Sequence, residues 1–486
     1  MKAARRGAKS AMISMELAGG DCLNAGCVPS KALLRCAKLI REAKKAAVKN
    51  NEFGIEFSQN GKRVDVDVNV DFSKVMERMR RLRSSIAPVD GHARGNSIGS
   101  AVFQGKGVFT SPYTVEVVEH GKKQGDASNP ILRFRKAVIA TGGKPSIPNI
   151  KGLREAPYTT NLNLFNLQSL PTRMVVLGAG IVALEMAQAF AAFGSTVTVL
   201  QRSRLLSQDE EAGTLIRQKL EQDGVVFLDE VNVTEVKTLK PRDKNGGLPL
   251  MSIILTHKLS SKPISLDCEC FLIAIGRTAN VRNMGLEAAK VDYHPKQGVL
   301  VNDYAQSICN PNIYAVGDCV ANVPRLTHMS GEMAKVVVQN SLFGGEWKLT
   351  SLVVPAVMYT EPEYAVVSQV VTLDANGRII PAPKENNQDV DVYKTELRSN
   401  DRAILDSSDE NSYVKISCVK GTGTIISCSI ISSRAGEMIN EVSLAMKNGI
   451  DMQGLGRNIH AYPTLGEGVM GCGLQFIGAR WEKMAS

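Results

Sequence analysis

The sequence of 486 residues contains no apolar run that approaches the length of a membrane span. It also shows no charged, apolar and small-residue signal at its start, and its ten cysteines are too sparse for a secreted disulfide scaffold. We therefore expect a soluble protein without a membrane partner, in a reducing compartment such as the cytoplasm or an organelle matrix.

Aromatic residues and clustered charges are scarce as well. The net charge of +10 is spread along amphipathic helices instead of forming one basic patch, which argues against a nucleic-acid partner. Only two tryptophans accompany 42 glycines, a composition that fits an α/β protein with several tight strand-to-helix turns. The length predicts three or four domains.

What the sequence does contain, near its start, is a pair of cysteines separated by four residues. Cys22 and Cys27 open an evident helix, and the chain can fold back at Gly26 to close a small disulfide ring. Pro29 and Ser30 suit a helix start whose free N–H groups stabilise a thiolate. The pattern indicates a redox pair in which Cys27 readily forms a thiolate. The alternative is two buried cysteines that act as small apolar residues.

A nucleotide motif follows the apolar strand predicted at 174–177. Gly178 and Gly180 lead to Ala183 and an alanine-rich helix, and a second parallel strand is predicted at 197–200. In such a turn the first glycine permits the tight bend, the second lets a pyrophosphate approach the backbone, and the alanine allows close helix–strand packing. The pattern predicts dinucleotide binding, with a purely structural turn as the alternative.

The residue that ends the second strand of such a motif indicates which nucleotide binds. An acid there pairs with the ribose hydroxyls of NAD, whereas arginines accept the additional phosphate of NADP. Here the position is Gln201, and Arg202 and Arg204 follow it. We therefore expect NADP(H), with NAD(H) as the alternative.

Three further predicted strands end in glycine turns, where parallel sheets often meet a cofactor. They run into Thr141-Gly142-Gly143, Gly276-Arg277 and Gly317-Asp318, and the aspartate could bind sugar hydroxyls or cap the next helix.

Cys268 and Cys270 share a face of another predicted strand. With no second ligand pair nearby, we expect them to pack in the core and expect no metal site.

Two nucleotide sites and a cysteine pair on one chain imply electron transfer from a nicotinamide to a disulfide, for which a flavin is the natural relay. The segment GGDCLNAGCVPSKALL at residues 19–34 resembles the flavin-dependent pyridine nucleotide–disulfide oxidoreductases, the family of dihydrolipoamide dehydrogenase, glutathione reductase and mercuric reductase. The resemblance covers nearly the whole chain. It implies an enzyme that passes electrons from NAD(P)H through FAD to the Cys22–Cys27 disulfide, and on to a small-molecule or protein disulfide or a soft electrophile.

The resemblance also implies the architecture. The fold class would be α/β, with two Rossmann-like dinucleotide-binding domains and an α+β C-terminal dimerisation domain, and a homodimer is expected. The expected domains are an FAD-binding domain with the redox disulfide at 1–150, an NAD(P)-binding domain at 151–285, a return to the FAD-binding or central domain at 286–350, and the dimerisation domain at 351–486.

Individual roles follow from the same resemblance. It implies that Cys22 is the interchange thiol facing the substrate, that Cys27 is the charge-transfer thiol against the flavin, and that Lys31 pairs with Glu185 beside the reactive flavin nitrogen. The cofactor-binding residues that we expect for FAD and NADP are Lys31, Gly107, Thr141, Gly142, Gly178, Gly180, Ala183, Gln201, Arg202, Arg204, Gly276, Gly317, Asp318, Leu326 and Thr327.

The sequence departs from the family pattern at its start. The family begins with a strand, a GxGxxG turn and a helix that grip the FAD pyrophosphate, and none of these precedes Gly7. Ser14 stands where the family usually has a ribose-binding acid. A truncated gene model or fragment would explain the missing segment. A non-catalytic remnant that still binds NAD(P) and dimerises, but is defective in FAD binding, is the alternative function.

The C-terminal segment departs as well. The family's catalytic base usually precedes a Pro-Thr pair, but here Tyr462 holds that position and His460 lies two residues earlier. A neutral phenol is a poor base at neutral pH, so the proton step is expected to involve His460 or Tyr462 from the partner subunit, polarised by Glu467. Tyrosine at this place, Gln201-Arg202 and the segment 400–404 resemble mercuric reductase and its relatives. Cys472 alone cannot replace the terminal cysteine pair of those enzymes, so mercury is not the expected substrate.

Overall fold

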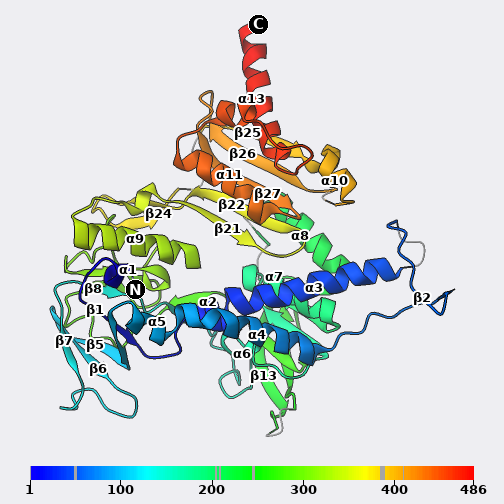
Figure 1. The fold of residues 1–486 in the computed structure, drawn as a ribbon. Coiled ribbons are helices and arrows are strands. Elements are labelled where there is room, and N and C mark those ends of the chain that lie inside the picture. Colours follow the sequence, from blue (N-terminus) through cyan, green and yellow to red (C-terminus); the bar gives the residue numbers. More distant parts are fainter. Residues whose placement is uncertain are drawn as a thin grey trace.

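The computed structural model describes residues 2–48, 52–202, 205–206, 209–243, 247–383, 389–408 and 410–485. Figure 1 shows the chain as two α/β regions side by side, with a third, C-terminal region stacked above them. Two long helices, α3 (Cys27–Ala47) and α4 (Phe72–Asp90), run across the middle of this view. Within the described part, no helix is long and apolar enough to cross a membrane.

The first region is built from parallel strand pairs. Strand β1 (Ser10–Ser14) pairs with β4 (Ser100–Gln104), and β8 (Ala137–Ile139) pairs with β20 (Ile313–Ala315). Because β20 comes from far along the chain, the backbone leaves this region after β8 and later returns to it. Helix α9 (Thr327–Phe343) follows β20 and buries Met329, Met333, Val336 and Val337 against this core.

An antiparallel sheet adjoins these pairs, formed by β5 (Lys106–Ser111), β6 (Thr114–Val118) and β7 (Ile131–Arg133). Strands β4 and β5 follow one another directly and are separated at Gly105. A Cβ atom at Gly105 would lie only 2.6 Å from the carbonyl oxygen of Val118, so the chain turns there in a space that fits glycine alone.

The second region is a four-stranded parallel sheet in the order β12 (Val225–Leu228), β11 (Thr196–Leu200), β10 (Arg173–Leu177) and β16 (Cys270–Ile273). Helix α7 (Ile181–Phe193) is almost fully buried, consistent with its alanine-rich sequence. Helix α8 (Glu210–Gln222) packs on β12. An antiparallel meander of β13 (Val231–Lys240), β14 (Leu250–His257) and β15 (Ser260–Cys268) covers part of the sheet.

The third region is a five-stranded antiparallel sheet in the order β21 (Val353–Met358), β22 (Glu363–Gln369), β27 (Ile425–Ser432), β26 (Tyr413–Val419) and β25 (Val390–Glu396). Helix α11 (Ala435–Lys447) packs on β21, β22 and β27. Helix α12 (Met452–Arg457) packs against α13 (Glu467–Ala485), whose end projects away from the molecule in Figure 1. The predicted α/β fold class is confirmed.

Short elements complete the fold. They are α1 (Lys2–Arg5), α2 (Gly20–Ala25), β2 (Ser58–Gln59), β3 (Lys62–Arg63), α5 (His92–Ser97), β9 (Gly143–Pro145), α6 (Asn161–Leu164), β17 (Arg277–Ala279), β18 (Tyr293–His294), β19 (Gly298–Val299), β23 (Val371–Leu373), β24 (Ile379–Pro381) and α10 (Asp401–Leu405). Cys268 is the last residue of β15 and Cys270 is the first residue of β16, and both cysteines are buried.

Candidate active site

The turn before Cys22 explains why glycines precede the first cysteine. Gly19 and Gly20 have φ values of 89° and 58°, a region that side chains disfavour, and a Cβ atom at Gly19 would lie 2.4 Å from the side chain of Leu23. Gly26 separates α2 from α3, and its Cβ atom would lie 2.9 Å from the carbonyl oxygen of Asp21. The two short turns therefore place Cys22 on α2 and Cys27 at the first position of α3.

The two thiols have opposite acidities because they interact with one another. The hydrogen bond from the Cys22 thiol is the largest cause of the lowered pKa of Cys27, which falls to about 6 although burial opposes it. The Thr327 hydroxyl, 3.2 Å from the Cys27 sulfur, and the charge of Lys31 lower this pKa further. The same hydrogen bond to Cys27, and then burial, raise the pKa of Cys22. Cys27 is therefore the thiolate of the reduced pair near neutral pH.

This difference predicts the pH dependence of alkylation in the reduced protein. Below about pH 6 Cys27 is a thiol and reacts slowly, and above that pH it becomes the thiolate that reacts with iodoacetamide. The alkylation rate of Cys27, followed by peptide mass spectrometry from pH 4 to 9, should rise through a midpoint near 6. A midpoint at the ordinary cysteine value of about 8.5 would contradict the assignment. Cys309, an exposed cysteine beside Asp292, is the internal control and should react only at higher pH.

Next to the cysteines lies an ion pair that joins α3 to α7. Lys31 Nζ donates to both carboxylate oxygens of Glu185, each at 2.9 Å. Glu185 is 1% exposed, and its Oε1 also accepts from the backbone N–H of Tyr359 at 3.0 Å. Lys31 Nζ also lies 4.5 Å from the centre of the Tyr359 ring. These contacts satisfy a buried carboxylate and fix a half-buried cation beside Cys27.

Arg277 ties three glycine turns together. Its Nε donates to Asp318 Oδ2 at 2.9 Å, and its Nη2 donates to the carbonyl oxygen of Gly143 at 2.6 Å and to the carboxylate of Asp21. The residue before the first cysteine is thus connected to the turn after β20. No role for Asp21 or Arg277 can be predicted from the sequence, because neighbours along the chain do not indicate pairs 256 residues apart.

Several expected cofactor residues gather around this network. Thr327, which begins α9 after the half-buried Leu326, is exposed beside Cys27. The Thr141 hydroxyl donates to the carbonyl oxygen of Asn280 at 2.6 Å. Asp318 Oδ1 makes no hydrogen bond to any described residue, so it can accept one from a sugar or polyol hydroxyl.

The glycines in these turns also leave room for a ligand. Gly142 and Gly276 have φ values of 67° and 109°, and a Cβ atom at either position would meet open space. Gly317, at a φ of 74°, is required for packing instead, because its Cβ atom would lie 2.6 Å from Ser330 Oγ. Gly107 lies within β5, where its Cβ atom would make ordinary contact with Ile13. A free acceptor at Asp318, open glycine turns and the Lys31–Glu185 pair fit the polyol and ring portions of a flavin.

The predicted dinucleotide turn lies between β10 and α7. Gly178 has a φ of 115°, and its Cβ atom would lie 2.4 Å from the carbonyl oxygen of Ala274. Gly180 is the N-cap of α7 and faces open space, while Ala183 is fully buried. The free N–H groups at the start of α7 are therefore open to a phosphate group.

At the end of β11, Gln201 is buried and its side chain turns towards the next strand. Its Nε2 donates to Asp229, which also accepts two hydrogen bonds from Arg217 at 2.7 and 2.9 Å. Gln201 Oε1 is buried and has no partner in the described part of the chain, so a ribose hydroxyl could donate to it. Arg202 is exposed, and Lys258 Nζ donates to its carbonyl oxygen at 3.5 Å. Arg204 lies outside the described residues.

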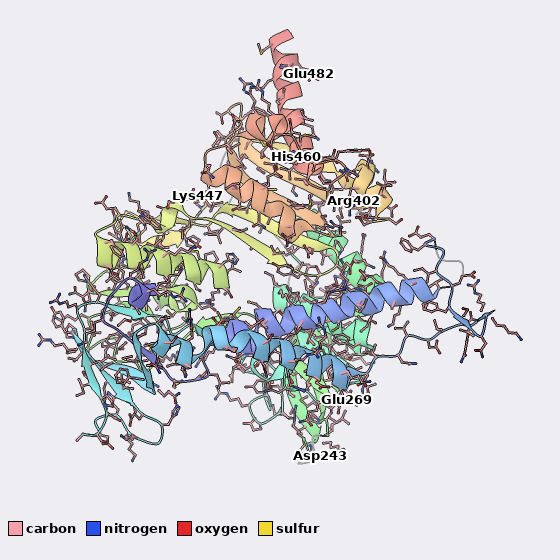
Figure 2. The ribbon with its side chains drawn as sticks, viewed as in Figure 1. Asp243, Glu269, Arg402, Lys447, His460 and Glu482 are labelled. Atoms are coloured by element: carbon pink, nitrogen blue, oxygen red, sulfur yellow. The ribbon has the colours of Figure 1, made fainter. Side chains whose placement is uncertain are left out.

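The C-terminal candidates lie in the third region, away from α2 and the start of α3, which carry Cys22 and Cys27, and Figure 2 labels His460 there. The His460 ring is almost buried at 7% exposure, and its Nε2 lies 2.8 Å from Glu441 Oε1. The Tyr462 side chain is exposed, and its hydroxyl donates to Asp401 Oδ2 at 2.6 Å. Glu467 Oε2 accepts from the backbone N–H of Thr464 at 3.0 Å. His460 Nδ1 also lies 3.0 Å from the carbonyl oxygen of Asn458, so the ring of His460 has Glu441 and Asn458 as neighbours and Tyr462 has Asp401.

The fold and the site together define a class of protein: a parallel sheet with a dinucleotide-type turn, a second region of parallel strand pairs, and two neighbouring cysteines beside the Lys31–Glu185 ion pair. Comparisons with known proteins specify the family. A model of the pyridine nucleotide-disulphide oxidoreductases matches residues 1–334, and a model of the dimerisation domain of the same family matches residues 354–471.

Individual relatives agree with these matches. Dihydrolipoyl dehydrogenase of Staphylococcus aureus is 30% identical over 98% of this chain and 93% of its own length. Mercuric reductase of Lysinibacillus sphaericus is 29% identical over 99% of this chain and 81% of its own length. The solved structure of the flavoprotein disulfide reductase RclA from Escherichia coli shares the fold, with a TM-score of 0.77 and 21% identity over 98% of this chain and 95% of that one.

The chain belongs to the pyridine nucleotide-disulphide oxidoreductase family. It is a flavin-dependent oxidoreductase that uses FAD and NAD(P)H and acts on disulfides. FAD, when bound, supplies a two-electron relay between a nicotinamide and a disulfide. The matched dimerisation domain supports a homodimer. The alternative of a non-catalytic remnant is not favoured.

Proposed function

We propose that Cys22 and Cys27 are the redox-active pair, with Cys22 towards the substrate and Cys27 towards FAD. The observation that carries this proposal is the position of the Cys27 sulfur, 3.2 Å from the hydroxyl of Thr327 at the start of α9 and near the Lys31–Glu185 pair, where its neighbours lower its pKa. Lys31, Thr141, Gly142, Asp318, Leu326 and Thr327 are the residues that would hold FAD.

In the reduced enzyme, the dithiol transfers two electrons to the substrate. The Cys22 thiolate attacks one sulfur of a substrate disulfide, which forms a mixed disulfide and releases the other half of the substrate as a thiolate that takes up a proton. The Cys27 thiolate then attacks Cys22, which releases the second thiolate product and restores the Cys22–Cys27 disulfide. Because the pKa of Cys22 is raised, its proton must pass to a base before the first attack.

The acid–base group would come from the loop at 460–467 of the partner subunit. Tyr462 keeps its proton, since the hydrogen bond to Asp401, the charges of Asp401 and Glu467, and a small burial effect all raise its pKa. The His460–Glu441 pair has the composition of a base with an orienting carboxylate. We therefore propose that His460 of the partner subunit accepts the proton of Cys22 and that the neutral hydroxyl of the partner subunit's Tyr462 orients the substrate.

This division of roles predicts different defects in two variants. His460→Ala should slow the reaction of the reduced enzyme with a disulfide by about 10²-fold, the usual contribution of a general base, and should change its pH profile. Tyr462→Phe should raise KM with a smaller effect on the rate and leave the pH profile in place. Stopped-flow kinetics of the dithiol half-reaction separates the two. Full activity in both variants would remove this loop from the mechanism.

The nicotinamide is proposed to be NADPH, because Arg202 is exposed at the end of β11 and Lys258 lies beside it. Replacing Arg202 with glutamate should lower kcat/KM for NADPH by roughly 10- to 100-fold, since a charge-assisted contact is lost and a repulsion added. The value for NADH should change little. Arg154→Glu, at an exposed position elsewhere in 151–285, is the matched control. An unchanged preference between the two nucleotides in Arg202→Glu would refute the assignment.

The substrate is proposed to be a disulfide or another soft electrophile. Mercuric ion is disfavoured because Cys472, the last cysteine of the chain, is buried and lies 3.3 Å from the Thr395 hydroxyl. The proposed domains are 1–150 and 286–350 for FAD, 151–285 for NAD(P) and 351–486 for dimerisation. The course of the chain supports this division, because β20 returns to pair with β8.

A further inference from the structure

A small cavity of about 170 Å³ lies between α3 and the turn that joins β21 to β22. One wall is a row of basic side chains spaced three or four residues apart, so they lie on one face of α3. The opposite wall carries two carboxylates. The charged residues that line the cavity are Lys31, Arg35, Lys38, Arg41, Glu361 and Glu363.

Arg41 contains an unsatisfied donor at this cavity. Its side chain is only 14% exposed, and Nη2 donates to Glu361 Oε2 at 2.7 Å. The other terminal nitrogen, Nη1, is buried and has no hydrogen-bond partner among the residues that the structure describes. A buried cationic donor without an acceptor is costly, so this nitrogen favours the entry of a group that accepts hydrogen bonds.

The charges around the cavity favour an anion as that group. Glu361 is shared, because Lys38 Nζ lies 3.5 Å from its Oε1 while Arg41 holds its Oε2. Arg35 is exposed and forms no ion pair within the described ranges. Burial raises the pKa of Glu363, whose carboxylate accepts from the backbone N–H of Gly436 at 2.8 Å. Because Lys31 is already paired with Glu185, three further cations, Arg35, Lys38 and Arg41, face the two carboxylates.

From this geometry we infer that the cavity is a binding site for a phosphate group, taken either as free phosphate or as part of a small phosphate monoester. The guanidinium of Arg41 offers Nη1, while Arg35 and Lys38 supply further positive charge at the open side. This site is formed by α3 and the β21–β22 turn, whereas the dinucleotide turn is formed by β10 and α7. The inference does not depend on the proposed redox mechanism.

The test is a calorimetric titration of the full-length protein with inorganic phosphate at constant ionic strength set with chloride. Saturating NADP⁺ is present throughout, so that phosphate cannot bind in the dinucleotide turn. We expect saturable binding of one phosphate per subunit. Arg41→Gln should weaken it by about tenfold or more. Because Arg41 also ties α3 to the β21–β22 turn, Arg35→Ala serves as a second variant at an exposed position and should weaken binding about threefold or more.

Lys45→Ala, on the same helix but not among the lining residues, is the matched control and should bind phosphate as the parent does. A parallel titration with glycerol 2-phosphate shows whether the site prefers free phosphate or a phosphate monoester. Whichever compound binds more tightly, a loss of its binding in Arg41→Gln supports the site. The inference is overturned by an absence of saturable binding to either compound. It is equally overturned if Arg41→Gln and Arg35→Ala both bind as the parent does, or if Lys45→Ala weakens binding as much as they do.

Discussion

Replacing Cys27 with serine is expected to abolish NADPH-dependent reduction of a disulfide, with a loss of at least about a thousandfold. A serine hydroxyl cannot form the intramolecular disulfide that restores the oxidised pair. Cys22→Ser should be equally inactive towards a disulfide, because the attacking sulfur is gone. The measurement is the NADPH-dependent rate with an artificial disulfide, on protein loaded with FAD.

Variants at the two cysteines should nevertheless differ in alkylation. In Cys22→Ala, which leaves no hydrogen-bond donor at this position, Cys27 loses its largest pKa-lowering partner, so the pH midpoint of its alkylation should move up from about 6. Cys27→Ser removes the partner that raises the pKa of Cys22, so the alkylation midpoint of Cys22 should move down. Cys309→Ser is the matched control and should keep full activity. Appreciable disulfide reduction by either Cys22→Ser or Cys27→Ser would contradict the assignment of the pair.

The second large effect is expected at the Lys31–Glu185 pair. Glu185→Gln removes the charge that compensates a half-buried lysine, and it should lower the free energy of unfolding by about 1 to 3 kcal/mol, measured by urea denaturation. The same change leaves the positive charge of Lys31 less compensated, so the thiolate of Cys27 is favoured and its pKa should fall below about 6.

Lys31→Met should shift the pKa of Cys27 in the opposite direction. Removing the cation removes one of the causes that lower this pKa, so the alkylation midpoint should rise. Opposite shifts in the two variants are the signature of an electrostatic role, since a general loss of packing would move both the same way. Glu42→Gln, at an exposed position of α3, is the control and should shift neither the pKa nor the stability. Shifts of the same sign in Glu185→Gln and Lys31→Met would contradict this account.

Local sequence signals predicted the elements that depend on neighbours along the chain. The alanine-rich helix that follows Gly180 and the strands that precede Gly178 and Gln201 depend on apolar periodicity and turn residues, which a window of ten to fifteen residues contains. The glycines before Cys22 and after β10 were informative for the same reason, because backbone conformation and close approach dictate them locally.

The contacts that surround the candidate site could not be predicted in this way. Arg277 meets Asp21 across 256 positions, and Tyr462 meets Asp401 across 61. Such pairs are set by how separate regions dock, and any exposed acid and base of suitable reach could form them. The unsatisfied nitrogen of Arg41 is a further example, since only the packing of α3 against the β21–β22 turn isolates it.

One measurement tests the central claim most directly. The FAD-loaded protein is reduced anaerobically with one equivalent of NADPH per subunit, and its new thiols are alkylated and located by peptide mass spectrometry. We predict two new thiols per subunit, at Cys22 and Cys27, and none at the other eight cysteines. NADPH consumption without new thiols at Cys22 and Cys27, or new thiols elsewhere, would contradict the account.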